Sequence, residues 1–172
     1  MISGKIKPSK DLVERLYAAV RGIGDQAEST REVIAGVLGL HRTDLAGVDF
    51  LYAKQGACTA GELSKATGLS SGATTTLIDR LEKAGFVARE DDPKDRRRQM
   101  VRLSDRASKR CEAIYEPIRK DLFRLWSSYT ADELELVEGF ITRGIKLHAE
   151  SLERLGSVSK TSQAGVRKPV SR

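Results

Sequence analysis

Residues 70–104 read SSGATTTLIDRLEKAGFVAREDDPKDRRRQMVRLS, and this stretch decides the fold. Leu77 and Leu81 are four residues apart, so they lie on one face of a helix whose leading end is polar. Gly85 is a typical end for such a helix, because glycine enters the left-handed conformation without a steric penalty. The pattern therefore predicts a helix with one apolar face that ends at Gly85.

Two short runs with strand-like sequences follow, and a charged loop separates them. Residues 86–89 and 99–103 both carry extended-chain patterns. Pro93 and its neighbouring aspartates favour an open turn, so the cations of the loop are expected to project into solvent and bind phosphate. These cations are Lys94, Arg96, Arg97 and Arg98.

A short helix is predicted upstream of this region. Thr59 and Glu62 have the spacing of a capping box, and the helix they start continues through Ala66. Gly68 and the residue after it then turn the chain toward Ser70. A helix, a turn, a second helix and a hairpin in this order predict a winged helix-turn-helix.

The same region resembles a known family. The run LIDRLEKAGFVAREDDPKDRRRQMVRLS, residues 77–104, resembles the signature of the multiple-antibiotic-resistance regulator (MarR) family of bacterial transcription factors. Its most specific part is DPKDRR after LIDRLEKAG, and the resemblance extends from about Leu12 to Leu155. It implies a mainly α fold with a small β-hairpin wing, and double-stranded DNA as the partner.

Small hydroxyl side chains gather at the start of the second helix. Such side chains can hydrogen-bond base edges or phosphates, whereas local capping and solvation are their alternative use. At Thr76 the sequence departs from the family, because many relatives carry Arg there, and this shifts more of the expected binding to the wing. The candidate DNA contacts on this helix are Ser70, Ser71, Thr74, Thr75, Thr76 and Arg80.

Two aspartates are expected to anchor the wing. A carboxylate facing DNA repels phosphate, so Asp79 is predicted to orient an arginine, and the resemblance implies a wing-anchoring role for it. Arg96 and Arg97 match the family's DRR, and one of them is expected to enter the minor groove, held by Asp95. A solvated loop of charges is the alternative.

Amphipathic helical patterns flank the winged region on both sides. One helix is predicted to begin after Ser9 as its N-cap, a second over residues 30–38, and a third at Thr43. Beyond the wing we predict one long helix and then another that is capped by Thr130 and Glu133.

These patterns divide the chain into four segments. Residues 9–42 and 105–155 are predicted to hold dimerisation helices that together form a bundle, residues 43–104 the DNA-binding domain, and residues 156–172 a disordered basic tail. The apolar stripes of the terminal helices exceed what one small domain needs, and the resemblance implies a homodimer. The alternative is that the stripes cover the core of a monomer.

The resemblance also implies a small-molecule effector. Relatives often bind small aromatic or phenolic molecules between the dimerisation helices and the DNA-binding lobe. His41 lies near that predicted junction, and Tyr17, Phe50 and Tyr52 are further candidates for such a pocket. A packed or surface histidine is the alternative for His41.

Other classes of function find little support in the sequence. Residues 68–72 match GxSxG, but a helix rather than a strand is predicted before them, so we do not predict an enzyme. Cys58 and Cys111 are far apart without a CxxC pair, and neither a metal nor a cofactor is expected. No apolar run approaches the roughly twenty residues that span a bilayer, so a cytoplasmic protein without membrane contact is predicted.

The predicted function is sequence-specific DNA binding by a homodimeric transcriptional regulator. Within the family such proteins are most often repressors, which a small-molecule ligand releases from a near-palindromic promoter site. An architectural DNA binder without sequence preference and a winged-helix module that docks other proteins are the alternatives.

Overall fold

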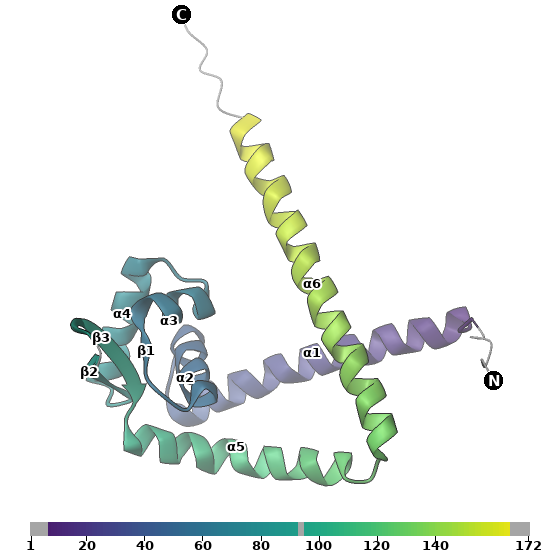
Figure 1. Ribbon diagram of the computed structural model, residues 1–172, viewed down its shortest axis with the longest axis horizontal. Helices are drawn as coiled ribbons and strands as arrows, with labels where there is room; N and C mark the ends of the chain where they lie inside the picture. Colours follow the sequence, from purple (N-terminus) through teal and green to yellow (C-terminus); the bar gives the residue numbers. More distant parts are fainter. Residues whose placement is uncertain (1–6, 93–94, 166–172) are drawn as a thin grey trace, which may run out of the picture. The chain divides into compact units, whose positions relative to one another are not determined.

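The computed structural model describes residues 7–92 and 95–165 (Figure 1). The chain divides into two compact units, one up to Pro117 and one from Ile118, and each is described by itself. The elements in order are α1 (Lys10–Leu38), α2 (Arg42–Lys54), β1 (Cys58–Thr59), α3 (Ala60–Thr67), α4 (Ser71–Lys83), β2 (Val87–Asp92), β3 (Asp95–Leu103), α5 (Asp105–Trp126) and α6 (Ala131–Gly165). This is the predicted winged helix-turn-helix within a mainly helical chain.

The first helix begins where the sequence predicts but ends later. Ser9 is its N-cap, with the hydroxyl oxygen accepting a hydrogen bond from the backbone N–H of Leu12. The predicted start of a second helix at residue 30 and the predicted break at Gly36 are wrong, because α1 is one continuous helix from Lys10 to Leu38. A glycine within a helix costs only about 1 kcal/mol. The helix ends instead at Gly39, which takes the left-handed conformation with φ of 68°.

The helix-turn-helix follows its predicted caps closely. Thr59 and Glu62 form the capping box of α3, with a bond of 3.2 Å from the Glu62 N–H to the Thr59 hydroxyl and one of 2.8 Å from the Thr59 N–H to the Glu62 carboxylate. Gly68 then turns the chain at φ of 70°. Ser70 caps α4, because its hydroxyl accepts from the Ala73 N–H at 3.3 Å.

The wing is longer than the sequence predicts. The sheet is antiparallel in the order β1-β3-β2, and its short first strand was not predicted. The strands extend into the charged loop, where Asp91 pairs with Gln99 and Asp92 with Asp95, so the open loop predicted between residues 89 and 99 is wrong. Backbone hydrogen bonds do not depend on side-chain polarity, and the ion pairs of Arg98 with Asp92 and of Arg102 with Glu90 across the strands support the pairing.

One hydrophobic core lies in the first unit. It joins the end of α1, the helices α2 to α4, the sheet and the start of α5. Its most deeply buried large side chains are Leu45, Leu51, Leu63, Leu77 and Leu81. We call residues 34–115, which contain this core, the winged lobe. The core fixes α4 against the lobe with its polar face outward.

The last helix begins as predicted and continues farther. Thr130 and Glu133 cap α6 reciprocally, with the Thr130 N–H donating to the Glu133 carboxylate at 2.9 Å. The helix runs to Gly165, past residue 156, where the sequence analysis places the start of a disordered tail. That boundary is wrong, and the remainder of the predicted tail lies outside the described residues. Residues 157–164 contain neither glycine nor proline, so no strong helix breaker stops the nucleated helix before Gly165.

Candidate nucleic-acid interface

The recognition helix α4 has one buried and one exposed face. Leu77 and Leu81 are buried against the core, as their spacing predicts, and Ile78 is buried beside them. Thr74 shares that face, because it precedes Leu77 by three residues and Ile78 by four. Its side chain is 1% exposed, and its hydroxyl donates to the Ser70 carbonyl at 2.9 Å. The burial of Thr74 therefore contradicts the predicted DNA contact at this residue.

The remaining hydroxyls of α4 lie at or near its exposed face. The hydroxyl of Thr75 donates to the Ser71 carbonyl and that of Thr76 to the Gly72 carbonyl, both at 3.1 Å. A hydroxyl that has given its hydrogen inside the helix keeps its oxygen as an acceptor. These threonines are thus suited to the amino groups of adenine and cytosine in the major groove.

Arg80 is anchored at one edge of this face. Its Nη2 donates to Asp44 Oδ1 at 2.5 Å and its Nε to Asp44 Oδ2 at 3.3 Å. The side chain of Arg80 is 51% exposed, whereas that of Asp44 on α2 is 10% exposed. Hydrogen bonding and charge attraction from Asp44 raise the pKa of Arg80 above its ordinary value. The guanidinium is therefore held in place on a side chain that is half exposed.

The opposite edge of α4 holds the wing. Arg89 on β2 donates to the carboxylates of both Asp79 and Glu82 on α4. These bonds raise the pKa of Arg89, with the hydrogen bond to Asp79 as the largest cause. Asp79 thus has an arginine partner on the wing. The sequence predicts an arginine partner for Asp79 without identifying it as Arg89, whose position just after the helix end is the available signal.

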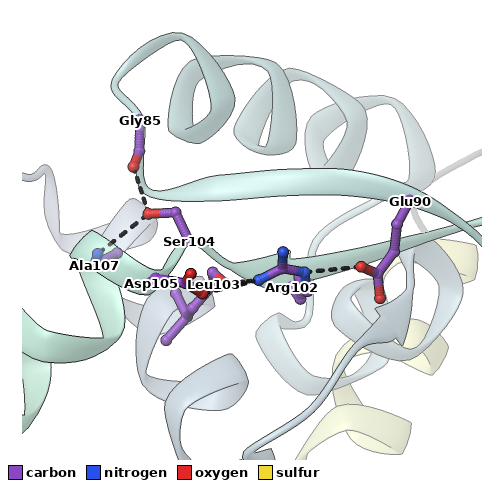
Figure 2. Close-up of polar contacts among 7 residues, drawn as sticks. All are labelled: Gly85, Glu90, Arg102, Leu103, Ser104, Asp105 and Ala107. Atoms are coloured by element: carbon purple, nitrogen blue, oxygen red, sulfur yellow. Dashed lines mark hydrogen bonds and ion pairs between the residues drawn. The ribbon is translucent and has the colours of Figure 1, made fainter.

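The other face of the wing is tied to α5, a feature that the sequence analysis missed (Figure 2). Arg102 on β3 donates from Nε to Glu90 on β2 at 2.8 Å and from Nη1 to Asp105 at 3.4 Å. Ser104 donates to the Gly85 carbonyl at 2.8 Å and accepts from the Ala107 N–H at 3.1 Å. The serine three residues before the Ala107 N–H was a readable cap signal.

The predicted cations at the wing tip are only partly described. Arg98 lies 3.9 Å from Asp92 across the hairpin. Lys94 lies outside the described residues, and of Arg96 and Arg97 only the backbone in β3 is described. Asp95 faces Asp92 in the strand register. The predicted contact between Asp95 and an arginine of the tip therefore stays a prediction.

Comparison with known proteins places this site in a family. A sequence profile of the MarR family matches residues 38–98. The HTH-type transcriptional regulator YcgE of Bacillus subtilis (strain 168) is 42% identical over 135 residues, which are 78% of this chain and 87% of that protein. The chain belongs to the MarR family. It is accordingly a DNA-binding transcriptional regulator and not an enzyme, as the sequence predicts.

Other MarR family proteins agree with this assignment. The multiple antibiotic resistance protein MarR of Escherichia coli (strain K12) is 36% identical over 81 residues, covering 46% of this chain and 56% of that protein. The structure of a MarR family protein from Bacillus stearothermophilus matches with a TM-score of 0.60 and 25% identity, over 85% of this chain and 99% of the other. The winged fold is therefore that of the MarR family.

The four residues predicted to form a ligand pocket in this MarR family protein do not come together. His41 caps α2, with Nδ1 3.4 Å from the Thr43 N–H, and it lines a cavity of about 690 Å³ beside Arg80. Tyr52 stacks on Tyr115 and lines a different cavity of about 370 Å³. Phe50 packs against the core, and Tyr17 on α1 is 64% exposed. His41 and Tyr52 are eleven residues apart along α2, which corresponds to roughly 16 Å at the helical rise per residue.

The two cysteines of the chain are buried and free. Burial raises the pKa of the Cys58 thiol to about 11 and also raises that of Cys111. Within residues 7–92 and 95–165, no three His, Cys, Asp or Glu side chains form a group that could hold a metal ion. None of the helices in this described part is both long and apolar enough to cross a membrane.

Proposed function

We propose that this MarR family protein is a homodimeric repressor that binds a near-palindromic promoter site and is released by a small-molecule ligand. The observation that carries the proposal is the exposed polar face of α4, flanked by an arginine that Asp44 holds and by a wing that Asp79 and Glu82 hold. Rigid placement of these groups lowers the entropy lost on binding, which favours a specific site over binding to any duplex.

The proposed DNA contacts combine base recognition with phosphate binding. The exposed hydroxyls of α4 would enter the major groove, with Arg80 on phosphate, while the cations of the wing would reach the adjacent minor groove. Asp79 and Asp95 would anchor the wing. The full set of proposed contacts is Ser70, Ser71, Thr75, Thr76, Arg80, Lys94, Arg96, Arg97 and Arg98.

Exposed apolar stripes support the proposed homodimer. Apolar side chains at helical spacing are uncovered on the first half of α1 and along α6. Stripes of this kind favour burial against another helix. We therefore assign dimerisation to residues 9–42 and 105–155, and the twofold axis would place the two α4 helices about 34 Å apart, one turn of DNA. The exposed residues include Leu12, Leu16, Val20, Val137, Ile141 and Ile145.

Named relatives support repression and relief by a ligand. The transcriptional repressor MprA of Escherichia coli (strain K12) is 31% identical over 97 residues, covering 56% of this chain and 54% of that protein. The fold is also shared, at 20% identity and a TM-score of 0.56, with MepR of S. aureus bound to ethidium bromide. A ligand that prefers the dimer with wrongly spaced helices would release DNA, and a hundredfold release needs about 2.7 kcal/mol. Such a regulator would act in the cytoplasm, where the bacterial chromosome lies.

Selection of bound fragments from a genomic duplex pool tests the proposal. At salt near the physiological value, we expect enrichment of a palindrome with half-sites about one helical turn apart. Equal retention of all duplexes would indicate an architectural protein, and no retention would indicate a protein-docking module. Either outcome would overturn the proposal.

The wing is tested with the selected fragment. Arg97→Ala is expected to weaken binding and to reduce the slope of log affinity against log salt by about 0.9, since one phosphate contact is lost. Arg143→Ala on α6 removes the same charge far from α4 in sequence and serves as the matched control. Equal slopes for Arg97→Ala and the native protein in a fluorescence-anisotropy titration would contradict a DNA contact at Arg97.

A further inference from the structure

The wing is held from both of its faces. Side chains alternate along a strand, and the register pairs Val101 with Arg89 and Ala88 with Arg102. Arg89 therefore lies on the face that α4 covers, whereas Glu90 and Arg102 lie on the opposite face. Arg102 continues from there to Asp105 in the first turn of α5. The two arginines thus connect the same hairpin to two different helices.

The guanidinium of Arg102 forms hydrogen bonds to neighbouring groups of its own chain. Its Nε donates to Glu90, and its Nη1 donates to the Leu103 carbonyl at 3.1 Å and to Asp105 at 3.4 Å. Glu90 is the largest cause of the raised pKa of Arg102. Because two carboxylates surround a single cation, the group as a whole presents negative rather than positive charge. Such a group is a poor ligand for phosphate.

Ser104 fixes the adjacent backbone. Its hydroxyl bridges the Gly85 carbonyl, just after α4, and the Ala107 N–H in α5, while its own N–H donates to the Phe86 carbonyl at 2.9 Å (Figure 2). The root of the wing is therefore pinned next to Arg102. With its root pinned, the hairpin is held by Arg89 on the face toward α4 and by Arg102 on the face toward α5.

We propose that Arg102 is a positioning residue for DNA binding. It clamps Glu90 on the wing to Asp105 on α5, and this clamp sets the direction in which the wing tip meets DNA. Arg102 itself does not contact phosphate. The inference rests on the proposed function only in that a selected DNA site is needed to measure it.

Substitution of Arg102 separates positioning from contact. Arg102→Gln is expected to weaken binding to the selected site about tenfold, because the wing samples other inclinations before it binds. The slope of log affinity against log salt should stay that of the native protein, since no phosphate contact is lost. Arg102→Lys should bind more tightly than Arg102→Gln but more weakly than the native protein. A lysine ammonium can form one of the two ion pairs, but it lacks the planar set of donors with which a guanidinium reaches both carboxylates.

Removal of the carboxylates gives a result of opposite sign for the two roles. If Arg102 positions the wing, Glu90→Gln combined with Asp105→Asn weakens specific binding although it removes two negative charges. If Arg102 binds phosphate, the same change frees its charge and strengthens binding with a steeper salt slope. Glu112→Gln removes one α5 carboxylate that has no ion pair within the described residues, and it serves as the control for the loss of each negative charge. A triple variant that combines Arg102→Gln, Glu90→Gln and Asp105→Asn should bind no more weakly than Arg102→Gln alone. The reason is that groups acting as one clamp are not additive when they are removed together.

Amide hydrogen exchange provides the structural readout. In Arg102→Gln, exchange in the wing strands should accelerate, while the amides of α4 keep the native rate. If general unfolding caused the weaker binding, amide exchange would instead accelerate in both the wing strands and α4. A salt slope reduced by about 0.9, or unchanged affinity in Arg102→Gln, would overturn the proposal. Failure of the native protein to bind any selected DNA would count against the proposed function instead.

Discussion

The winged lobe and α6 use the same helical periodicity with opposite results. In the lobe, the apolar stripe of α4 is covered by its own chain, and Leu77 is 0% exposed. On α6 the stripe is uncovered, and Ile145 is 65% exposed. An apolar stripe on a helix therefore predicts that another surface covers it, but it does not identify that surface. In the lobe that partner is intramolecular, and for α6 we propose a second copy of the chain.

The largest effect is expected in the core of the lobe. Leu77→Ala should lower the free energy of unfolding by about 3 kcal/mol, because it leaves a cavity between packed side chains. Leu136→Ala on α6 removes the same atoms from a side chain that is 71% exposed and should cost less than about 0.5 kcal/mol in the monomer. Urea denaturation at low protein concentration measures both. Equal losses would erase the distinction between the two regions.

A charge on the stripe of α6 should act on assembly rather than on folding. Ile145→Glu should weaken the proposed dimer by about 2 kcal/mol, because a carboxylate would be buried without a partner. Lys146→Gln changes the charge by the same amount one position along the helix and should leave assembly unchanged. Sedimentation velocity reports the outcome. A native protein that stays monomeric at every concentration would contradict the role given to α6.

The two capping boxes allow a matched comparison of helix starts. Thr59→Ala should cost about 1 kcal/mol, because α3 carries the buried side chain of Leu63 and cannot fray without disturbing the core. Thr130→Ala removes an equivalent cap from α6, whose first turn is exposed, and should cost clearly less. Urea denaturation and amide exchange near each cap measure the difference. A larger loss for Thr130→Ala would reverse the comparison.

The smallest effect concerns pH. The hydrogen bond from Lys54, at 2.6 Å, and those from Thr59 lower the pKa of Glu62 from 4.5 to about 2. A carboxyl whose pKa is lower in the folded state stabilises the fold above its unfolded pKa, and this contribution is lost as pH falls toward about 2. Glu62→Gln should therefore flatten the decline in stability between about pH 5 and pH 2.

Glu133 in α6 is the counterpart for that measurement. Its pKa is also lowered, first by the hydrogen bond from the Thr130 backbone. It has no counterpart of the Lys54 contact among the ion pairs of the described residues. Thermal unfolding across the same pH range should thus change less in Glu133→Gln than in Glu62→Gln. Profiles for Glu62→Gln that parallel those of the native protein would exclude a contribution from the Glu62 pairs.

Local patterns predicted the parts of the fold that depend on neighbouring residues. The caps at Ser9, Thr59 and Thr130 are present as expected, because capping involves groups only three residues apart. The expected separation of residues 30–38 as a second helix was wrong for the opposite reason. Continuation of α1 depends on the packing of Ile34 and Leu38 in the core, which no local pattern contains.

The sequence by itself determined the helix-turn-helix, its order with the wing, and membership of the family, because these follow from short-range periodicity and a contiguous motif. Tertiary structure decided how the polar and charged side chains are used. Only the fold shows that Thr74 faces inward, that Asp44 holds Arg80 across 36 positions of sequence, and that Arg102 pairs within its own chain. The physical reason is that an ion pair is set by distance in space, which the order of residues does not specify.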